Sequence, residues 1–313
     1  MSLIIVPSGI KLKAIESSVT FRLNSNTNQL LNIYGQGTVE GINFDANGGP
    51  FSARMIQLTS GGIFQDNHVY GAQNMTDGEY ETNIIAVKNT FGAIIRRNYF
   101  ENAKMLNNPV FFGDIGSIRI TNSTGVYFSE NIIKVDKILA GGQLMQVMGS
   151  SQVWIEDNTI ENANAIFLTL TTGNKDIFFR RNKVNISSGG NVAGGTILVF
   201  ANTNGISTGN IVIEGNDFIT MGSSNNITNV EFSSATIIRS KGNATAFLDG
   251  LSIKNNTFTC NGGPSGVVTA IDLNNRTNRA SIFGNHSMGC STFLIEAGVS
   301  TTQTENRKDG VVQ

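Results

Sequence analysis

Apolar and polar residues alternate in short runs along this chain, and one form of the alternation returns many times. In VWIEDNTI, Val153 and Ile155 are apolar positions two residues apart, and Asn158 follows three residues after Ile155. The arrangement apolar-x-apolar-x-x-Asn-x-apolar occurs in eight stretches, the last of them degraded. The other seven are GIFQDNHV (62–69), AIIRRNYF (93–100), VYFSENII (126–133), IFFRRNKV (177–184), IVIEGNDF (211–218), LSIKNNTF (251–258) and ASIFGNHS (280–287). An apolar period of two predicts strands and not helices.

The spacing of the copies predicts a solenoid. Successive repeat asparagines are 24 to 40 residues apart, a variable period that suits a stack of coils with insertions between strands. Further short apolar runs, such as MIQL (55–58) and LMQV (144–147), precede the copies, so each unit holds two or three strands. A coil of about 30 residues that rises by one strand spacing, about 4.8 Å, stacks each strand in parallel on its counterpart. The pattern therefore predicts an all-β chain folded as a parallel β-helix.

The repeat asparagine is expected to occupy the same bend of every coil. There it can tolerate an unusual turn conformation and bond the backbone or its stacked neighbours through its side-chain amide. A structural role is therefore favoured for these residues, and no chemistry is assigned to them. They are Asn67, Asn98, Asn131, Asn158, Asn182, Asn216, Asn256 and Asn285.

Composition agrees with a turn-rich β structure and excludes several classes of partner. The 313 residues include 35 glycines but only 4 prolines, and charged residues make up 14%, against about 25% in average globular proteins. The net charge of −1 gives no indication of binding to nucleic acid or to a membrane surface. No apolar run is long enough to predict a transmembrane helix. With two histidines and no Cys/His cluster, neither a zinc site nor any other cofactor is predicted.

The two cysteines lie a few residues after the repeat asparagines of the last two copies. This spacing could place Cys260 and Cys290 on adjacent coils, within reach of a disulfide. The sequence favours the other interpretation, two buried and reduced thiols, because free cysteine is among the most buried residue types.

The repeat resembles that of the right-handed, pectin-lyase-like β-helix superfamily, which includes pectate lyases, polygalacturonases, alginate epimerases and bacteriophage tailspikes. The resemblance covers roughly residues 30–297, and NIYGQGTVEGINFDANG (32–48) looks like an opening coil. It implies a single β-helix of about ten coils over 31–297, an N-terminal cap or lead-in over 1–30, and a polar C-terminal tail over 298–313. Motifs of the enzymes are missing: Asn158 stands where pectate lyases have histidine, and the Asp pair, Gly-His-Gly and Arg-x-Lys of polygalacturonases are absent.

Register within the copies predicts which side chains point outward, because alternate residues of a strand face opposite sides. One outward column is mostly apolar, and Tyr127, Trp154 and Phe178 are successive members of it. Such a stripe can be a subunit interface, a surface on which sugar rings stack, or a strip covered by a long loop. The next outward column contains Arg96, Glu156, Arg180, Glu214 and Lys254, which predict either a solvated ladder of ion pairs or a binding site for an acidic polysaccharide.

Acid–base candidates lie in the insertions. The stretch YGAQNMTDGEYETN (70–83) follows His68 and contains Asp77, Glu79 and Glu81, and the next coil adds Glu101 and Asp114. Glycoside hydrolysis needs two carboxylates about 5–9.5 Å apart. A lyase or epimerase needs a base near the sugar and a cation against its carboxylate, a part that Arg96 or Arg97 could play.

The function favoured by the sequence is recognition and cleavage of a bacterial surface polysaccharide by a tailspike-like homotrimer, located in a virion tail or outside the cell. A non-catalytic adhesin or structural shaft is the first alternative. A monomeric secreted polysaccharide lyase or epimerase is the second.

Overall fold

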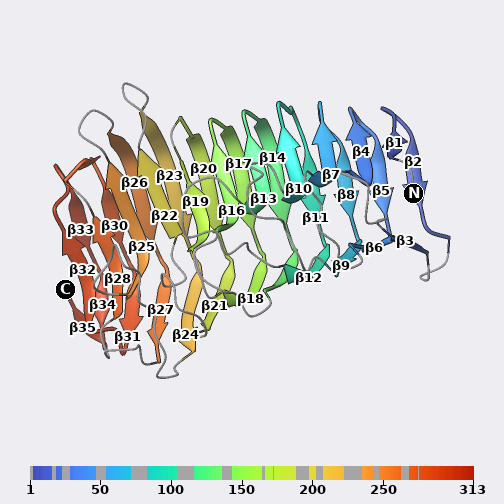
Figure 1. Ribbon diagram of the computed structural model, residues 1–313. Coiled ribbons are helices and arrows are strands. Elements are labelled where there is room, and N and C mark those ends of the chain that lie inside the picture. Colours follow the sequence, from blue (N-terminus) through green and yellow to red (C-terminus); the bar gives the residue numbers. More distant parts are fainter. Residues whose placement is uncertain are drawn as a thin grey trace, which may run out of the picture.

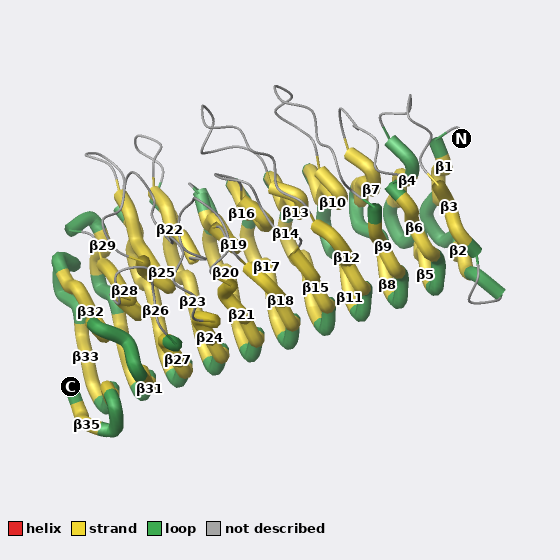
Figure 2. The backbone as a smooth tube through the Cα atoms, turned by 60° about the horizontal axis from the view of Figure 1, so that its bottom comes forward, coloured by secondary structure: helices red, strands yellow, loops and turns green. Residues whose placement is uncertain are grey.

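The structure is a computed structural model of the chain, and it contains strands and turns but no helix in the residues that it describes (Figures 1 and 2). These residues are 3–15, 19–22, 29–46, 54–71, 83–103, 116–135, 143–163, 166–171, 173–187, 197–201, 207–221, 235–242, 247–261, 268–273 and 275–313.

The strands form three sheets, and successive strands of the chain enter sheets A, B and C in turn. Sheet A consists of β1 (Ile4–Val6), β4 (Leu31–Tyr34), β7 (Arg54–Thr59), β10 (Asn83–Lys88), β13 (Gly116–Thr121), β16 (Gln143–Met148), β19 (Ile166–Leu170), β22 (Ile197–Ala201), β25 (Ala235–Gly242), β28 (Val268–Leu273) and β32 (Thr292–Glu296). Sheet B consists of β2 (Lys11–Lys13), β5 (Thr38–Glu40), β8 (Ile63–Gln65), β11 (Ile94–Arg96), β14 (Thr124–Ser129), β17 (Ser151–Glu156), β20 (Lys175–Arg180), β23 (Thr208–Glu214), β26 (Leu248–Lys254), β30 (Ser281–Phe283) and β33 (Thr302–Thr304), with β29 (Thr277–Asn278) paired to β26. Sheet C consists of β3 (Thr20–Arg22), β6 (Asn43–Asp45), β9 (His68–Tyr70), β12 (Tyr99–Ala103), β15 (Ile132–Val135), β18 (Thr159–Ala163), β21 (Lys183–Ser187), β24 (Asp217–Met221), β27 (Thr257–Cys260), β31 (His286–Met288), β34 (Arg307–Lys308) and β35 (Val311–Val312).

Each strand pairs in parallel with the strand that follows it by one coil, for example β14 with β17 and β17 with β20. The termini lie at opposite ends of the stack (Figure 1). The predicted parallel β-helix is confirmed by this topology.

Both ends of the chain take part in the stack. Strands β1, β2 and β3, within the stretch predicted as a lead-in, pair in parallel with β4, β5 and β6. Within the stretch predicted as a polar tail, β33 and β34 pair in parallel with β30 and β31, and β35 then turns back antiparallel to β34.

The apolar positions of the repeat fill the space between the sheets. In β17, Val153 and Ile155 are fully buried, and the equivalent residues of β14, Val126 and Phe128, are at most 1% exposed. Burial of one such side chain stabilises the fold by about 2 kcal/mol, so the stacked inner columns supply the main driving force for folding.

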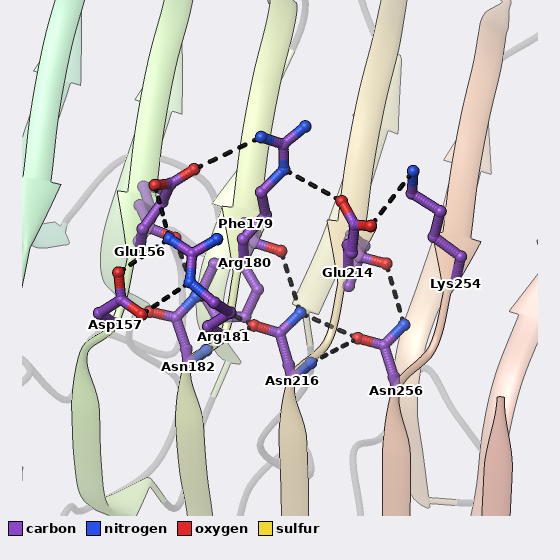
Figure 3. A network of polar contacts seen from close by, with 12 residues as sticks. Glu156, Asp157, Phe179, Arg180, Arg181, Asn182, Glu214, Asn216, Lys254 and Asn256 are labelled. Atoms are coloured by element: carbon purple, nitrogen blue, oxygen red, sulfur yellow. Dashed lines mark hydrogen bonds and ion pairs between the residues drawn. The ribbon is translucent and has the colours of Figure 1, made fainter. Parts of the chain in front are cut away.

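The repeat asparagines form a continuous ladder at the bend between sheets B and C. The side-chain oxygen of Asn158 accepts hydrogen bonds from the backbone N–H of Asn131 (2.9 Å) and from Nδ2 of Asn131 (3.1 Å). Nδ2 of Asn158 in turn donates to Oδ1 of Asn182 (2.9 Å) and to the carbonyl oxygen of Phe128 (3.0 Å). Figure 3 shows the same pattern at Asn182, Asn216 and Asn256. The predicted column of amides is confirmed.

The ladder also contains a ninth member that the sequence pattern missed. Asn306 accepts two bonds from Asn285 and is fully buried. Five and three residues before it, where most other copies have apolar residues, stand Thr301 and Gln303, so the apolar signal was lost while the amide remained.

The unusual turn conformation falls on the residue before each asparagine and not on the asparagine itself, which corrects the expectation. Asp157, for example, has φ 58° and precedes Asn158. The bend is two residues long in every described coil from β8 to β34, one left-handed residue and one asparagine. The left-handed residues are Asp66, Arg97, Glu130, Asp157, Arg181, Gly215, Asn255, Gly284 and Glu305.

A shorter polar ladder lies at the bend between sheets A and B. The backbone N–H of Thr90 donates to Oγ of Ser123 (3.2 Å), and that of Ser123 donates to Oγ of Ser150 (3.1 Å). Asn174 continues the row by accepting from the N–H of Ser150 (3.0 Å). These short polar residues satisfy buried backbone groups that would otherwise cost free energy.

Replacement of one central ladder residue tests its structural role. In Asn158→Ala, the buried N–H of Asn131 loses its acceptor and the carbonyl oxygen of Phe128 loses a donor, so we expect the free energy of unfolding to fall by about 3 kcal/mol. Urea denaturation measures the loss. The neighbouring half-buried Thr159→Ala is the control and should change stability by less than about 0.5 kcal/mol. Equal stabilities of the two variants would contradict a structural role for the ladder.

Cys260 and Cys290 form a disulfide between adjacent coils, with their Cα atoms 4.9 Å apart. The favoured expectation of two reduced thiols is wrong, and the alternative is correct. Parallel stacking explains the pairing, because residues about one coil apart become lateral neighbours. Here the separation along the chain is 30 residues.

The bridge is expected to stabilise the C-terminal coils. A loop of this length gives about 3.5 kcal/mol in the chain-entropy account of disulfides. The double variant Cys260→Ser/Cys290→Ser should therefore unfold at a lower temperature than the oxidised protein, and a reductant should lower the midpoint of the wild type but not of the variant. Two titratable thiols in the denatured, unreduced protein would refute the bridge.

Candidate functional site

The outer face of sheet B carries the aromatic column that the sequence predicted. Tyr127, Trp154 and Phe178 are register partners on β14, β17 and β20. Tyr127 is 45% exposed, while Trp154 and Phe178 are partly buried. The column therefore points away from the core.

The three rings stack on one another along the coil axis. The centroids of Tyr127 and Trp154 are 4.4 Å apart with 5° between the ring planes, and those of Trp154 and Phe178 are 5.7 Å apart with 14°. The guanidinium of Arg180 lies 4.4 Å from the Phe178 centroid. Both faces of Trp154 thus meet neighbouring rings, and the column presents ring edges to its surroundings. Tyr127 is the most exposed of the three rings, so it is the one most accessible to a sugar.

Beside the aromatic column, opposite charges alternate in the order that the sequence indicated (Figure 3). Arg180 lies between Glu156 (3.7 Å) and Glu214 (3.3 Å), and Lys254 lies 3.3 Å from the other oxygen of Glu214. These groups are partly exposed, so each pair adds about 0.5 kcal/mol or less. Their main effect is to hold long side chains in fixed positions on consecutive coils.

The left-handed residues of the bend add a second row of charges. Arg181 donates to both carboxylate oxygens of Asp157 (2.8 Å each) and to Glu156 (2.9 Å) (Figure 3). The hydrogen bonds that Arg181 donates to Asp157, and then to Glu156, raise the pKa of Arg181 above its usual value.

Arg96 lies on the same face, in the charge column of sheet B but nearer the N-terminal end. It donates through Nε to Gln65 (2.9 Å), which donates to Glu40 (2.8 Å). Hydrogen bonds from Lys11, Lys13 and Gln65 lower the pKa of Glu40 to about 2. One coil, that of Ser129, separates Arg96 from Glu156. Arg96 therefore does not contact the charged side chains beside the aromatic column.

The predicted acid–base residues Asp77, Glu79, Glu81 and Asp114 lie outside the described residues. Their assignment remains a prediction. The strands that precede their two loops are β9 and β12.

A groove runs along the outside of the bend between sheets B and C, over the first five coils. Its volume is about 620 Å³, within the range of ligand-binding clefts. One wall is formed by the left-handed residues Asp66, Arg97 and Glu130, and the other by residues at the start of sheet C strands. The latter are Asn43, His68, Tyr99 and Ile132.

His68 is the most constrained side chain of this groove. Its Nε2 lies 3.0 Å from Oε2 of Glu101 on the next coil. Its ring centroid is 4.9 Å from that of Tyr99, with 23° between the planes, and 4.8 Å from that of Tyr70. On the opposite wall, Arg97 binds both oxygens of Asp66 (2.8 and 2.9 Å), which raises the pKa of Arg97.

The sequence indicated Glu101 as a candidate acid and Arg97 as a candidate cation, with His68 beside the acidic loop, but it did not join them in one site. A usable signal existed, because the residue after each repeat asparagine points outward, and His68 and Tyr99 occupy that position in consecutive copies. The pairing of His68 with Glu101 depends on how the coils stack and on strand register. The sequence pattern predicts both only approximately.

No cluster of three or more His, Cys, Asp or Glu side chains that could hold a metal ion occurs in the described part of the chain. No helix long and apolar enough to cross a membrane occurs there either.

Comparison with known proteins gives structural similarities only. No protein-family model and no curated protein matches the sequence. The structure is similar to the Streptococcus pneumoniae surface protein and adhesin PfbA, with a TM-score of 0.48 and 10% identity, over 97% of this chain and 89% of that one. It is also similar to the A-module of the Azotobacter vinelandii mannuronan C-5 epimerase AlgE6 (TM-score 0.48, 11% identity, 98% and 90% covered). A third similarity is to the tailspike protein of the Escherichia coli bacteriophage HK620 (TM-score 0.42, 12% identity, 97% and 58% covered). At these values the comparisons say nothing of what this chain binds or does.

Proposed function

We propose that the protein recognises a bacterial surface polysaccharide along the outside of its β-helix and cleaves it, by hydrolysis or β-elimination, in a virion tail or outside the cell. The observation that carries the proposal is the outer face of sheet B. There an aromatic column lies beside charged side chains that ion pairs hold in place on consecutive coils. Such a face repeats at a regular interval, as the units of a polysaccharide do. The disulfide supports a location in an oxidising environment.

A second candidate function, a homotrimeric shaft or adhesin without catalysis, is supported by the stacking of the aromatic rings. Rings that present their edges suit close packing against another protein surface better than flat stacking on sugars. In this case Tyr127, Trp154 and Phe178 would lie in the seam between subunits.

Substitution of Tyr127, the most exposed of the three rings, separates these functions. If Tyr127 stacks on sugar, Tyr127→Ala should weaken binding to the recognised polysaccharide roughly fivefold, since an aromatic contact contributes about 1 kcal/mol. Titration calorimetry on a panel of capsule polysaccharides measures the affinity. Ser252→Ala, in the same column on a later coil, is the control and should bind as the wild type does.

Light scattering on the same proteins measures their oligomeric mass and so tests the subunit-seam alternative. A trimer that dissociates in Trp154→Glu, together with unchanged glycan affinity in Tyr127→Ala, would assign the aromatic column to a subunit seam.

Cleavage depends in this proposal on the loop acids. Glu79→Gln or Asp77→Asn should reduce the rate of release of reducing ends or unsaturated uronates by 10²- to 10⁴-fold, the usual contribution of a general acid or base. Glu81→Gln and Asp114→Asn complete the series. Glu305→Gln, an exposed carboxylate of the last coil, is the control and should leave the rate unchanged. Rates equal to wild type in all four loop variants would remove these loops from the mechanism.

A further inference from the structure

We propose that the groove at the bend between sheets B and C is a saccharide subsite for neutral or amino sugars, in which the imidazole of His68 accepts a hydrogen bond from a sugar hydroxyl. The inference rests on the proposed function, because it assigns a second part of the same glycan to a different face of the β-helix. It also narrows the class of sugar, as the charges of the groove show.

Glu101 determines which nitrogen of the His68 ring carries the proton. A carboxylate at 3.0 Å from Nε2 favours the tautomer in which that nitrogen carries the proton and donates it to Glu101. Nδ1 is then an acceptor, and no described residue donates a hydrogen bond to it. A sugar hydroxyl is a donor of the right kind for this atom.

Contacts with neighbouring rings hold the His68 side chain in a fixed position. The His68 ring is packed between Tyr70 and Tyr99, and both its neighbours lie on sheet C strands whose positions the asparagine ladder sets. Asn67 and Asn98, two members of the ladder, themselves line the groove. A side chain fixed in this way loses little conformational entropy when a ligand binds.

The groove presents both apolar and polar side chains. Ile132 is 45% exposed and Ile15 is 98% exposed, and both line the groove beside Asn43 and the Asp66–Arg97 pair. A sugar has apolar C–H faces and polar hydroxyl edges, so it can use both kinds of surface at once.

The charge of the groove selects the class of sugar. Among the side chains that line the groove, Asp66 and Glu130 are two carboxylates against the single guanidinium of Arg97. Arg97 is already bound in a fork to Asp66, so it is not available to a uronate. The excess of negative charge repels acidic sugars and favours neutral or positively charged ones.

The chain offers a direct spectroscopic test, because His68 and His286 are its only histidines. Both follow a repeat asparagine and begin a sheet C strand, β9 and β31, so His286 is a matched internal control. In protein with isotope-labelled histidine, short oligosaccharides of N-acetylglucosamine, or their de-N-acetylated forms, should shift the imidazole resonances of His68 and leave those of His286 in place. Oligogalacturonate of the same length should shift neither.

Variants complete the test. His68→Ala should weaken binding of the responding oligosaccharide about tenfold, the loss of one hydrogen bond in a fixed geometry, while His286→Ala should bind as the wild type does. Absence of a His68 shift with both the neutral and the amino oligosaccharide, or equal affinities of the two variants, would overturn the subsite. The proposed function would survive that result if capsule polysaccharide still bound to the wild type, and would fail separately if it did not.

Discussion

Every feature of this protein depends on the alignment of buried amides at the bend between sheets B and C. An asparagine side chain there bonds the backbone of the preceding coil and the asparagine of the following coil at once, so it locks adjacent coils in one register. A shift by one residue would bury the outer columns and expose the inner ones. Because the bonds lie within the core, away from competing water, a missing partner costs more free energy than an exposed hydrogen bond would.

This constraint explains where the connections between strands differ in length from coil to coil. The bend between sheets B and C has two residues in the described coils from β8 to β34, and the bend between sheets A and B carries a second polar ladder at Thr90, Ser123, Ser150 and Asn174. In the coils that carry these ladders, an insertion at either bend would cost buried hydrogen bonds. The longest stretches of the chain between strands fall in the connections from sheet C back to sheet A, including those with Asp77 and Asp114. Insertions that serve function can accumulate there at little cost in stability.

The fold was predictable because its signal is local and repeated. Each copy contains both the alternation that defines a strand and the asparagine that defines the bend, so the coil and the direction of its side chains follow from the sequence. Asn306 escaped because its copy is polar, and the left-handed conformation was placed one residue too late because many residue types, including Arg97 and Arg181, occupy that position. The disulfide depended on exact stacking of Cys260 on Cys290, which an approximate period leaves open.

The candidate site was less predictable, since it depends on how side chains meet across coils. The outward direction of Trp154 follows from alternation, but the orientation of its ring does not. Stacking turns its faces toward Tyr127 and Phe178, and this changes what the column can bind. The pair of His68 and Glu101 joins residues 33 positions apart, and neither residue type is unusual in its own copy. What makes the pair a candidate is the rigid frame, which brings an oriented imidazole, two tyrosines and a fixed Arg–Asp fork to one concave bend. A β-helix thus builds precise sites from ordinary surface residues, because its core has already fixed their spacing.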